Sequence, residues 1–362
     1  MFRYLTASFI TGGTVSSLRT TVLRSAATTM SSDPTSFGMK WHRSAIRCKD
    51  PATSVKFYEE NFGMRLVDVY HSTALGKSNY YLASLRKGES WPEPGSREAH
   101  ERLFDMDHNC VELMHDHGAE NDPDLRYNNG NEEPHRGFGH LALLTDDVYK
   151  ASEQLEKAGV SFKKKPGNME QYNEGRMKGL AFAYDPDGYW IEIVARDKGA
   201  GHPEPYNLGQ TMLRIKDVEK SLNFYTGEGG IGMTKVRELH LDDFSLYFLQ
   251  SLSAEEISSL PAPDSPSAYE RMNRSWAPVL ELTHNHGTEK DPEFSYHSGN
   301  TKPEGFGYLG FIVDDLEVAC KRLAEKGARK IPEPEAFAGK LARFEDPDGY
   351  HVQLALRKAV VD

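Results

Sequence analysis

A four-residue motif that could carry metal chemistry occurs twice in the chain. The first copy is Gly137-Phe-Gly-His140 and the second is Gly305-Phe-Gly-Tyr308, and an apolar run follows each of them. A neutral imidazole binds transition metals through a ring nitrogen, whereas tyrosine is a rare ligand in sites built from histidine and carboxylates. If the fold uses this position for chemistry, the first copy has kept that chemistry and the second has lost it.

Two glutamates stand inside apolar runs and could join such a site. Glu281 lies in the run Val-Leu-Glu-Leu, and Glu192 lies in the run Trp-Ile-Glu-Ile. A single glutamate in such a run could face solvent from a strand with alternating sides. If both instead face the interior, a metal ion or a base must offset their charge.

The positions of these residues are set by a duplication of the chain. Four motifs occur twice, in the same order and at near-constant spacing, so each copy is expected to be a domain rather than a short solenoid unit. The matched pairs are Lys49-Asp50 with Lys216-Asp217, Val111-Glu-Leu113 with Leu280-Glu-Leu282, the two Gly-Phe-Gly motifs, and Asp185-Pro-Asp-Gly-Tyr189 with Asp346-Pro-Asp-Gly-Tyr350.

Each copy predicts the same succession of elements. A β-like run leads into a helix that Asp50 or Asp217 caps, and strands carrying the Glu and the Gly-Phe-Gly motif follow. A second helix is expected at 148–158 and at 316–326, and an Asp-Pro-Asp-Gly turn then enters the last strand. We expect an α+β fold of tandem βαβββ domains. The predicted domains are 39–198 and 207–358, joined by a Gly/Pro-rich linker at 199–206.

Composition narrows the class of protein. The 362 residues suit about two domains. A net charge of −11 argues against a nucleic-acid partner. No apolar run reaches the roughly 18 residues of a membrane span. The three cysteines form no Cys-x-x-Cys pair, which is typical of free thiols in a reducing compartment.

Residues 1–38 differ from the rest of the chain. They are rich in Ser and Thr, carry several arginines, and contain no acidic residue before Asp33. This composition is typical of a transit peptide and predicts a mitochondrial protein, with a plastid as the alternative. Met30 could also serve as a second start site and give a cytosolic form.

Taken together, the motifs resemble those of glyoxalase I (lactoylglutathione lyase), in the vicinal oxygen chelate superfamily, in its fused two-domain form. The resemblance covers both copies, roughly residues 40–358, and implies vicinal-oxygen-chelate domains whose curved mixed sheets surround a metal site. Its carriers are Gln210-Thr-Met-Leu-Arg-Ile-Lys-Asp217, Leu280-Glu-Leu-Thr-His-Asn-His-Gly-Thr-Glu289, Arg136-Gly-Phe-Gly-His140, Gly175-Arg-Met-Lys-Gly-Leu-Ala-Phe182 and Asp185-Pro-Asp-Gly-Tyr-Trp-Ile-Glu192.

The resemblance implies a metal site with two ligands from each domain. The family draws Gln or His and a Glu from one domain, and His and a second Glu from the other. Crossing the two copies gives one complete set, formed by Gln210, Glu281, His140 and Glu192. The other crossed set contains a permanent cation and only one carboxylate, and is expected to bind no metal; it is formed by Arg43, Glu112, Tyr308 and Gln353.

The residues expected to bind the substrate also differ between the two crossed sites. By resemblance, the residues that hold the substrate around the complete site are Arg214, Asn285, Arg136, Lys165 (or its neighbour Lys164), Arg176 and Met177. Around the other site, Arg47 is retained, but Asp116 replaces the Asn and Glu304 replaces Arg136. An acid in place of a base repels a glutathione carboxylate. We therefore expect one working site and one degenerate site.

The implied reaction is the isomerisation of the methylglyoxal–glutathione hemithioacetal to S-lactoylglutathione through an enediolate. Zn²⁺ is expected to stabilise the enediolate charge, with Ni²⁺ or Co²⁺ as alternatives, and glutathione is the co-substrate. Glu192 is the expected main base and Glu281 the second carboxylate. The fusion supplies what a homodimer would supply by symmetry, so a monomer is expected.

Two other functions remain open at this point. A related dioxygenase would need an Fe(II) site with two His and one carboxylate. A non-catalytic glutathione- or metal-binding protein would need both sites to have decayed, and the complete set of four ligand residues argues against it.

Overall fold

The computed structural model describes residues 39–357, apart from 168–178, 228 and 334–338. The expected transit segment 1–38 and Met30 within it lie outside the described residues, as do Arg176 and Met177. No helix in the described ranges is long and apolar enough to cross a membrane.

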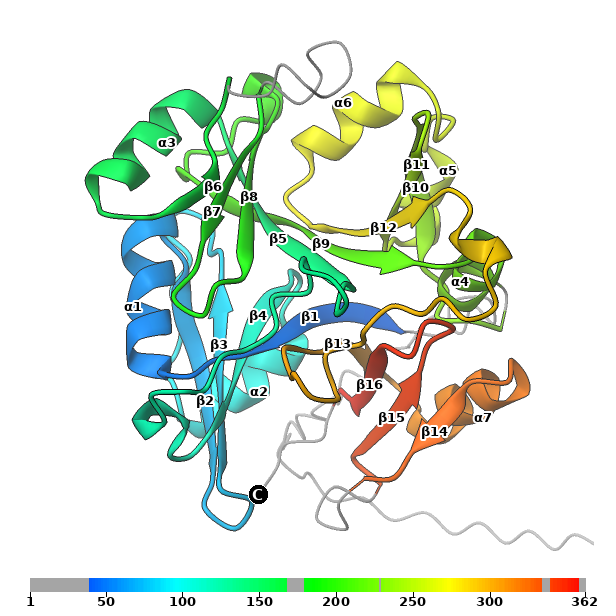
Figure 1. Cartoon of the computed structure of the whole chain (residues 1–362), viewed down its shortest axis with the longest axis horizontal. Coiled ribbons are helices and arrows are strands. Elements are labelled where there is room, and N and C mark those ends of the chain that lie inside the picture. Colours follow the sequence, from blue (N-terminus) through cyan, green and yellow to red (C-terminus); the bar gives the residue numbers. More distant parts are fainter. Residues whose placement is uncertain (1–38, 168–178, 228, 334–338, 358–362) are drawn as a thin grey trace, which may run out of the picture. The chain divides into compact units, whose positions relative to one another are not determined.

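The strands form two eight-stranded mixed sheets (Figure 1). In spatial order, the first sheet consists of β14 (Arg329–Ile331), β15 (Leu341–Glu345), β16 (His351–Leu356), β13 (Phe306–Val313), β1 (Lys40–Arg47), β4 (Cys110–Asp116), β3 (Lys77–Ala83) and β2 (Arg65–Ser72). The second consists of β10 (Thr234–His240), β11 (Phe244–Gln250), β12 (Val279–Asn285), β9 (Asn207–Ile215), β5 (Phe138–Thr145), β8 (Trp190–Ala195), β7 (Ala181–Tyr184) and β6 (Phe162–Lys164).

Helices and short 3-10 turns connect these strands. The helices are α1 (Pro51–Phe62), α2 (Arg97–Asp105), α3 (Val148–Lys157), α4 (Val218–Thr226), α5 (Ala254–Ser258), α6 (Pro266–Arg274) and α7 (Leu316–Glu325). The 3-10 turns are η1 (Ala119–Asn121), η3 (Lys198–Ala200) and η4 (Thr288–Lys290). The expected α+β fold is confirmed, and α3 and α7 agree with the predicted second helices to within one residue at their ends.

The sheets do not coincide with the sequence repeats, because each sheet takes half of its strands from each repeat. In the first sheet β1 pairs antiparallel with β13, and in the second sheet β5 pairs antiparallel with β9. The repeats thus exchange strands, and Figure 1 shows this exchange as red and orange strands of the second repeat beside blue strands of the first in one sheet. Every residue of β5, β9 and β13 is buried, so these strands are covered on both faces. The exchange places residues of both repeats in one sheet.

Aspartates set the helix starts that the sequence predicted. Asp50 accepts hydrogen bonds from the backbone N–H groups of Ala52 and Thr53 at the start of α1. Asp217 accepts one from Lys220 at the start of α4. These caps satisfy backbone donors that the first helical turn leaves unpaired.

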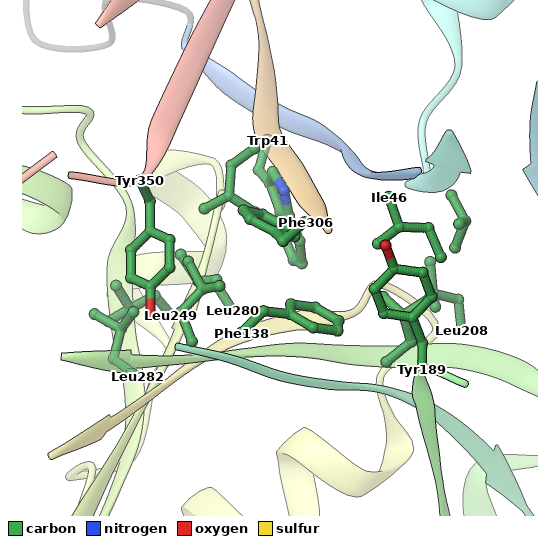
Figure 2. Close-up of a cluster of buried hydrophobic side chains, with 14 of the residues drawn as sticks. Trp41, Ile46, Phe138, Tyr189, Leu208, Leu249, Leu280, Leu282, Phe306 and Tyr350 are labelled. Carbon is green, nitrogen blue, oxygen red and sulfur yellow. The ribbon is translucent and has the colours of Figure 1, made fainter. Parts of the chain in front are cut away.

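The Gly-Phe-Gly motifs meet at the centre of the core, between the two sheets. The rings of Phe138 and Phe306 stack with centroids 5.0 Å apart and planes 9° apart. Tyr189 and Tyr350 contact these two rings edge-on, and Figure 2 shows them on either side of the pair. Because Phe138 belongs to the second sheet and Phe306 to the first, this cluster joins the two sheets.

The first glycine of each motif leaves room for backbone from the other repeat. A Cβ at Gly137 would lie 2.0 Å from the carbonyl oxygen of His297. At Gly305 the corresponding distance is 1.9 Å, to the carbonyl oxygen of Asn128. Any larger side chain would therefore force the two repeats apart at this crossing.

We expect Gly137→Ala to destabilise the protein by about 1–3 kcal/mol or more, because backbone must move to relieve the clash. The measurement is the free energy of unfolding in denaturant. Gly179→Ala is the matched control, since a Cβ there would meet nothing within 4 Å. Equal stability of the two variants would contradict the close approach at Gly137.

The Asp-Pro-Asp-Gly turns also join the sheets. Asp187, between β7 and β8, accepts hydrogen bonds from the backbone N–H of Lys49 (3.0 Å) and the hydroxyl of Ser54 (3.2 Å). Asp348 accepts the equivalent bonds from Lys216 (2.8 Å) and Ser221 (3.1 Å). The second aspartate of each turn thus ties a hairpin of one sheet to a strand–helix junction of the other.

Candidate metal centre

Four adjacent strands in the middle of the second sheet each direct one polar side chain to a common point. These strands are β12, β9, β5 and β8, and the four side chains are those of Glu281, Gln210, His140 and Glu192. Two of the strands come from each repeat. The crossed set inferred from the resemblance is therefore brought together within one sheet.

The polar atoms of this cluster lie within a few ångströms of one another. The Gln210 Nε2 lies 2.6 Å from the Glu192 Oε2 and 2.7 Å from the Glu281 Oε2. The His140 Nε2 lies 3.1 Å from the Glu192 Oε2 and 3.9 Å from the Glu281 Oε2. One ligand atom from each of the three ionisable residues can lie within 4.8 Å of the other two, so all three could reach one ion.

The chemistry of this donor set fits a divalent cation. The side chains are only 5–8% exposed, so two carboxylates face each other in a region that water hardly reaches. Two buried carboxylates repel unless positive charge lies between them. The Gln210 amide donates to both of them, and turning it about its own axis would present its oxygen instead. A metal ion would satisfy all four side chains at once.

The same burial changes the proton affinities of the cluster. Burial raises the pKa of Glu281 to about 7, and repulsion from Glu192 adds to the effect. Burial alone would lower the pKa of His140, but the carboxylate of Glu192 beside it more than offsets this and raises that pKa above its usual value. A carboxyl group that titrates near neutrality is suited to exchange protons with a substrate.

Neighbouring side chains fix the cluster and line its surroundings. The Thr283 hydroxyl donates to the Glu281 Oε1 at 3.1 Å. The ring of Phe182 packs edge-on against His140, with centroids 5.6 Å apart. Phe248 lies opposite Glu281 in the β11–β12 ladder and is also buried. The polar cluster is thus flanked by aromatic surface.

Arg214 lies on β9, the strand that carries Gln210, and is held by the loop before β5. Its Nη1 donates to the carbonyl oxygens of Gly130, Gly137 and Phe138, at 3.1 to 3.3 Å. Its Nη2 donates to the Asn131 Oδ1 at 2.9 Å. The guanidinium is therefore fixed in position, and its Nε is not used in these bonds.

Two further expected substrate residues lie toward the surface. Asn285 ends β12 and donates to the Tyr296 hydroxyl at 2.8 Å. Arg136 precedes β5 and pairs with Glu133 at 3.2 Å, with 39% of its side chain exposed. An ion pair this exposed contributes little and can be exchanged for a substrate carboxylate.

The structure does not bring Lys165 to the cluster. Its ammonium pairs with Glu156 of α3 instead. The preceding residue, Lys164, is buried, and its ammonium donates to the carbonyl oxygen of Leu180 at 2.9 Å. Burial lowers the pKa of Lys164, while the charge of Glu192 acts in the opposite direction. The short strand β6 ends at Lys164 and buries it, whereas Lys165 lies just beyond the strand with 44% of its side chain exposed. Lys164 is therefore the lysine nearer the buried cluster, and the charge of Glu192 acts on it.

The equivalent positions of the first sheet hold a charged network in place of a metal-binding cluster. The Arg43 Nε donates to the Glu112 Oε2 at 2.8 Å, and its Nη2 donates to the Gln353 Oε1 at 2.5 Å. The Tyr308 hydroxyl lies 2.7 Å from both Glu112 oxygens. Burial and the nearby Glu112 raise the pKa of Tyr308, so its hydroxyl keeps its proton. The guanidinium supplies the positive charge that a metal would supply in the second sheet.

We expect Arg43→Met to destabilise the fold by about 3–5 kcal/mol, because it leaves Glu112 buried and unpaired. Arg43→Met combined with Glu112→Gln should recover much of that loss. Chemical denaturation of both variants measures the difference. Similar stability of the single variant and the unchanged protein would show that Arg43 does not neutralise Glu112.

Two residues of the site were missed by sequence reasoning although a signal was present. Asn131, which holds Arg214, belongs to a motif that the repeat alignment contains, since Tyr127-Asn-Asn-Gly-Asn131 matches Tyr296-His-Ser-Gly-Asn300. Asn300 likewise accepts a hydrogen bond from the Arg47 Nη2 at 3.2 Å. Thr283, two residues after Glu281, shares its face of the strand because strand side chains alternate.

Sequence comparisons find the same family twice in the chain. The family model described as "Glyoxalase/Bleomycin resistance protein/Dioxygenase superfamily" matches residues 40–193 and again 207–354. The glyoxalase I of Saccharomyces cerevisiae is 38% identical over 332 residues, which are 90% of this chain and 93% of the yeast protein. The lactoylglutathione lyase of Schizosaccharomyces pombe is 34% identical over 323 residues, which are 88% of this chain and 97% of the relative.

Comparison with solved structures finds the same family as the sequence comparisons. The crystal structure of glyoxalase I from Zea mays superposes with a TM-score of 0.62 at 26% sequence identity. The match covers 88% of this chain and 93% of the maize chain.

Proposed function

This chain belongs to the glyoxalase/bleomycin resistance protein/dioxygenase superfamily, and from that premise we propose that it is a metal-dependent lactoylglutathione lyase. It converts the hemithioacetal of methylglyoxal and glutathione to S-lactoylglutathione. One of its two crossed sites is catalytic and the other is degenerate.

The observation that carries this proposal is the convergence of Glu281, Gln210, His140 and Glu192 from four neighbouring strands of one sheet. A dioxygenase would need two histidines and one carboxylate around Fe(II). The buried cluster found among the described residues contains one histidine and two glutamates. The donor set therefore favours proton-transfer chemistry over oxygen activation.

Gln210, Glu281, His140 and Glu192 would hold the metal, and we propose Zn²⁺ in this role. Two carboxylates, an imidazole and an amide oxygen suit Zn²⁺, and they also suit Ni²⁺ or Co²⁺. When bound, the ion supplies Lewis-acid stabilisation of negative charge on the substrate oxygens.

The proton moves between two neighbouring carbons of the substrate. Glu192 takes the proton from the carbon beside the carbonyl and returns it to the adjacent carbon. Glu281, the second carboxylate of the cluster, lies on the other side and can serve the opposite substrate enantiomer. The buried aromatic rings of Phe182 and Phe248 lie beside His140 and opposite Glu281, and they add apolar surface next to the polar cluster.

The glutathione part of the substrate is held by groups near the ends of three central strands of the second sheet. Arg214 and Asn285 lie on strands β9 and β12, and Arg136 lies at the start of β5. Their hydrogen bonds to carboxylates are charge-assisted where the donor is an arginine. Lys164 adds a further cation, and Arg176 and Met177 remain proposed contacts outside the described residues.

The proposed site needs no second copy of the chain, because both halves of the crossed ligand set come from one polypeptide. This supports a monomer as the working form. For the segment 1–38 we propose a mitochondrial transit peptide, on its composition alone.

The activity is tested with the full chain, loaded with zinc, by the ultraviolet absorbance of the thioester formed from methylglyoxal and glutathione. We expect thioester formation, its loss on removal of the metal with a chelator, and its recovery when zinc is returned. A zinc-loaded, folded protein that forms no thioester would overturn the proposal.

A further inference from the structure

A cavity of about 330 Å³ lies on the first sheet, at the position that corresponds to the metal centre of the second sheet. Glu112, Tyr308 and Gln353 of the degenerate set line it. Small-molecule sites in proteins occupy about 300–1,000 Å³, so the cavity is large enough for a small ligand.

Cations outnumber carboxylates around the cavity. Its lining includes Arg47, Lys77, Lys340 and Arg343, against the two carboxylates Asp68 and Glu112. Both carboxylates are already paired, since Glu112 bonds to Arg43 and Asp68 accepts a hydrogen bond from His100 at 2.6 Å. Three of the four cations also pair with carboxylates outside the lining, Arg47 with Glu304, Lys77 with Asp116 and Arg343 with Glu333. Among the described residues, Lys340 is thus the lining cation without an ion pair, and it supplies the positive charge that a ligand would meet.

The protonation of His351, which also lines the cavity, responds to these positive charges. The pKa of His351 falls to about 4, first through burial and then through the charges of Arg343 and Arg47. A neutral His351 leaves the arginines and lysines to define the charge that a ligand meets.

Two of the cations have hydrogen-bonding capacity to spare. Among the residues that the structure describes, Lys340 has no carboxylate within ion-pair distance. Arg343 pairs with the Glu333 Oε1 through its Nε at 3.4 Å, and among the described residues its two Nη groups make no hydrogen bond. Lys77 forms an ion pair with Asp116, and Arg47 donates hydrogen bonds to backbone carbonyls and to the Asn300 Oδ1. Lys340 lies just before β15 and Arg343 lies within it, and both line the cavity that a ligand anion would enter.

Apolar and aromatic side chains make up another part of the lining. It includes Tyr70, Tyr81, Phe104, Leu75, Leu103 and Leu341. Such a surface binds an apolar body by burying it, with the anion held at the basic end.

The same site is unsuited to glutathione and to the lyase reaction. Asp116 and Glu304 stand where the catalytic half has Asn285 and Arg136, so glutathione carboxylates would be repelled. Glu112 is neutralised by Arg43, and Gln353 has no carboxylate to accept a proton. A ligand held here would be bound without being converted.

We propose that this cavity is a non-catalytic binding site for a small organic monocarboxylate with an aromatic or branched apolar body, held at its carboxylate by Lys340 and Arg343. The catalytic site of the same chain does not take part in this binding.

The test is isothermal titration calorimetry of the full, metal-loaded chain with 3-phenylpropionate. We expect saturable binding of one molecule per chain with a Kd below about 1 mM. The uncharged 3-phenylpropanamide should bind at least about tenfold more weakly, because it lacks the charge-assisted bonds. S-hexylglutathione should not compete with 3-phenylpropionate.

Variants identify the site. Lys340→Met should weaken binding by about tenfold, and Leu341→Trp should block it by filling the cavity, while both variants keep lyase activity and thermal stability close to those of the unchanged chain. His140→Ala, on the other sheet, should bind 3-phenylpropionate unchanged. Absence of binding by the unchanged chain, binding that survives Leu341→Trp, or binding lost in His140→Ala would each overturn the proposal.

Discussion

His140→Ala is expected to abolish lyase activity, whereas Tyr308→Phe is expected to leave it unchanged within about twofold. His140 and Tyr308 hold the same place in the two repeats, but only His140 contacts two carboxylates that lack a permanent cation between them. Removing one metal ligand should cost about 4 kcal/mol of transition-state stabilisation, which is about a thousandfold in kcat/KM.

The two variants should also differ in metal content and in stability. His140→Ala should lose most of its bound metal, while Tyr308→Phe keeps it. Tyr308→Phe should lower the free energy of unfolding by about 1–3 kcal/mol, since Glu112 loses one hydrogen-bond donor in a buried site. Initial-rate kinetics, elemental analysis and chemical denaturation measure the three quantities. A loss of activity in Tyr308→Phe with metal retained would contradict the assignment of a single working site.

Conversion of the degenerate site should create a second metal centre. The triple variant Arg43→Gln, Tyr308→His, Gln353→Glu would give the first sheet the same four residue types as the second, with Glu112 already present. The strand registers are equivalent, because Glu112 lies opposite Ala45 as Glu281 lies opposite Met212. The metal content should rise from about one to about two ions per chain.

Two controls separate this gain from adventitious binding. Arg43→Gln alone should bind no additional metal, because it leaves a single carboxylate among the four side chains. The triple variant should unfold at a lower temperature without metal than with it, since two buried carboxylates then face each other without a cation. A triple variant that folds and still binds one ion would show that residue type alone does not distinguish the two sites.

Local sequence patterns predicted much of the fold, because caps, turns and helices form from interactions between residues that are close in the sequence. The caps at Asp50 and Asp217 depend on side chains that bond their own helix turn. The helices α3 and α7 follow from apolar spacing between an aspartate cap and a glycine. The duplication itself was visible in motifs such as Asp-Pro-Asp-Gly, whose aspartates proved to bridge the sheets.

The exchange of strands between repeats could not be deduced from periodicity. The strands β5, β9 and β13 are buried along their whole length, so their apolar runs do not specify which neighbour they pair with. The pairing depends on close approaches between distant parts of the chain, such as Gly137 with His297. The helices α2 and α6 were missed for a related reason, since their few buried residues gave a weak apolar pattern.

The candidate site was predicted in part. The resemblance pointed to His140, Glu192, Glu281 and Gln210, and the sheet brings those residues together. It did not reveal that the Arg43 guanidinium replaces the cation in the other sheet, because that depends on three side chains distant in sequence. Of the two lysines that the resemblance offered, the structure buries Lys164 and leaves Lys165 half-exposed beside Glu156.

The central claim is that the chain holds one metal ion, in the second sheet, between side chains from both repeats. Anomalous diffraction from crystals of the metal-loaded protein, measured at the absorption edge of the metal, tests it directly. The expected result is one strong peak among Gln210, Glu281, His140 and Glu192. A peak among Arg43, Glu112, Tyr308 and Gln353, or no peak at the first position, would contradict it.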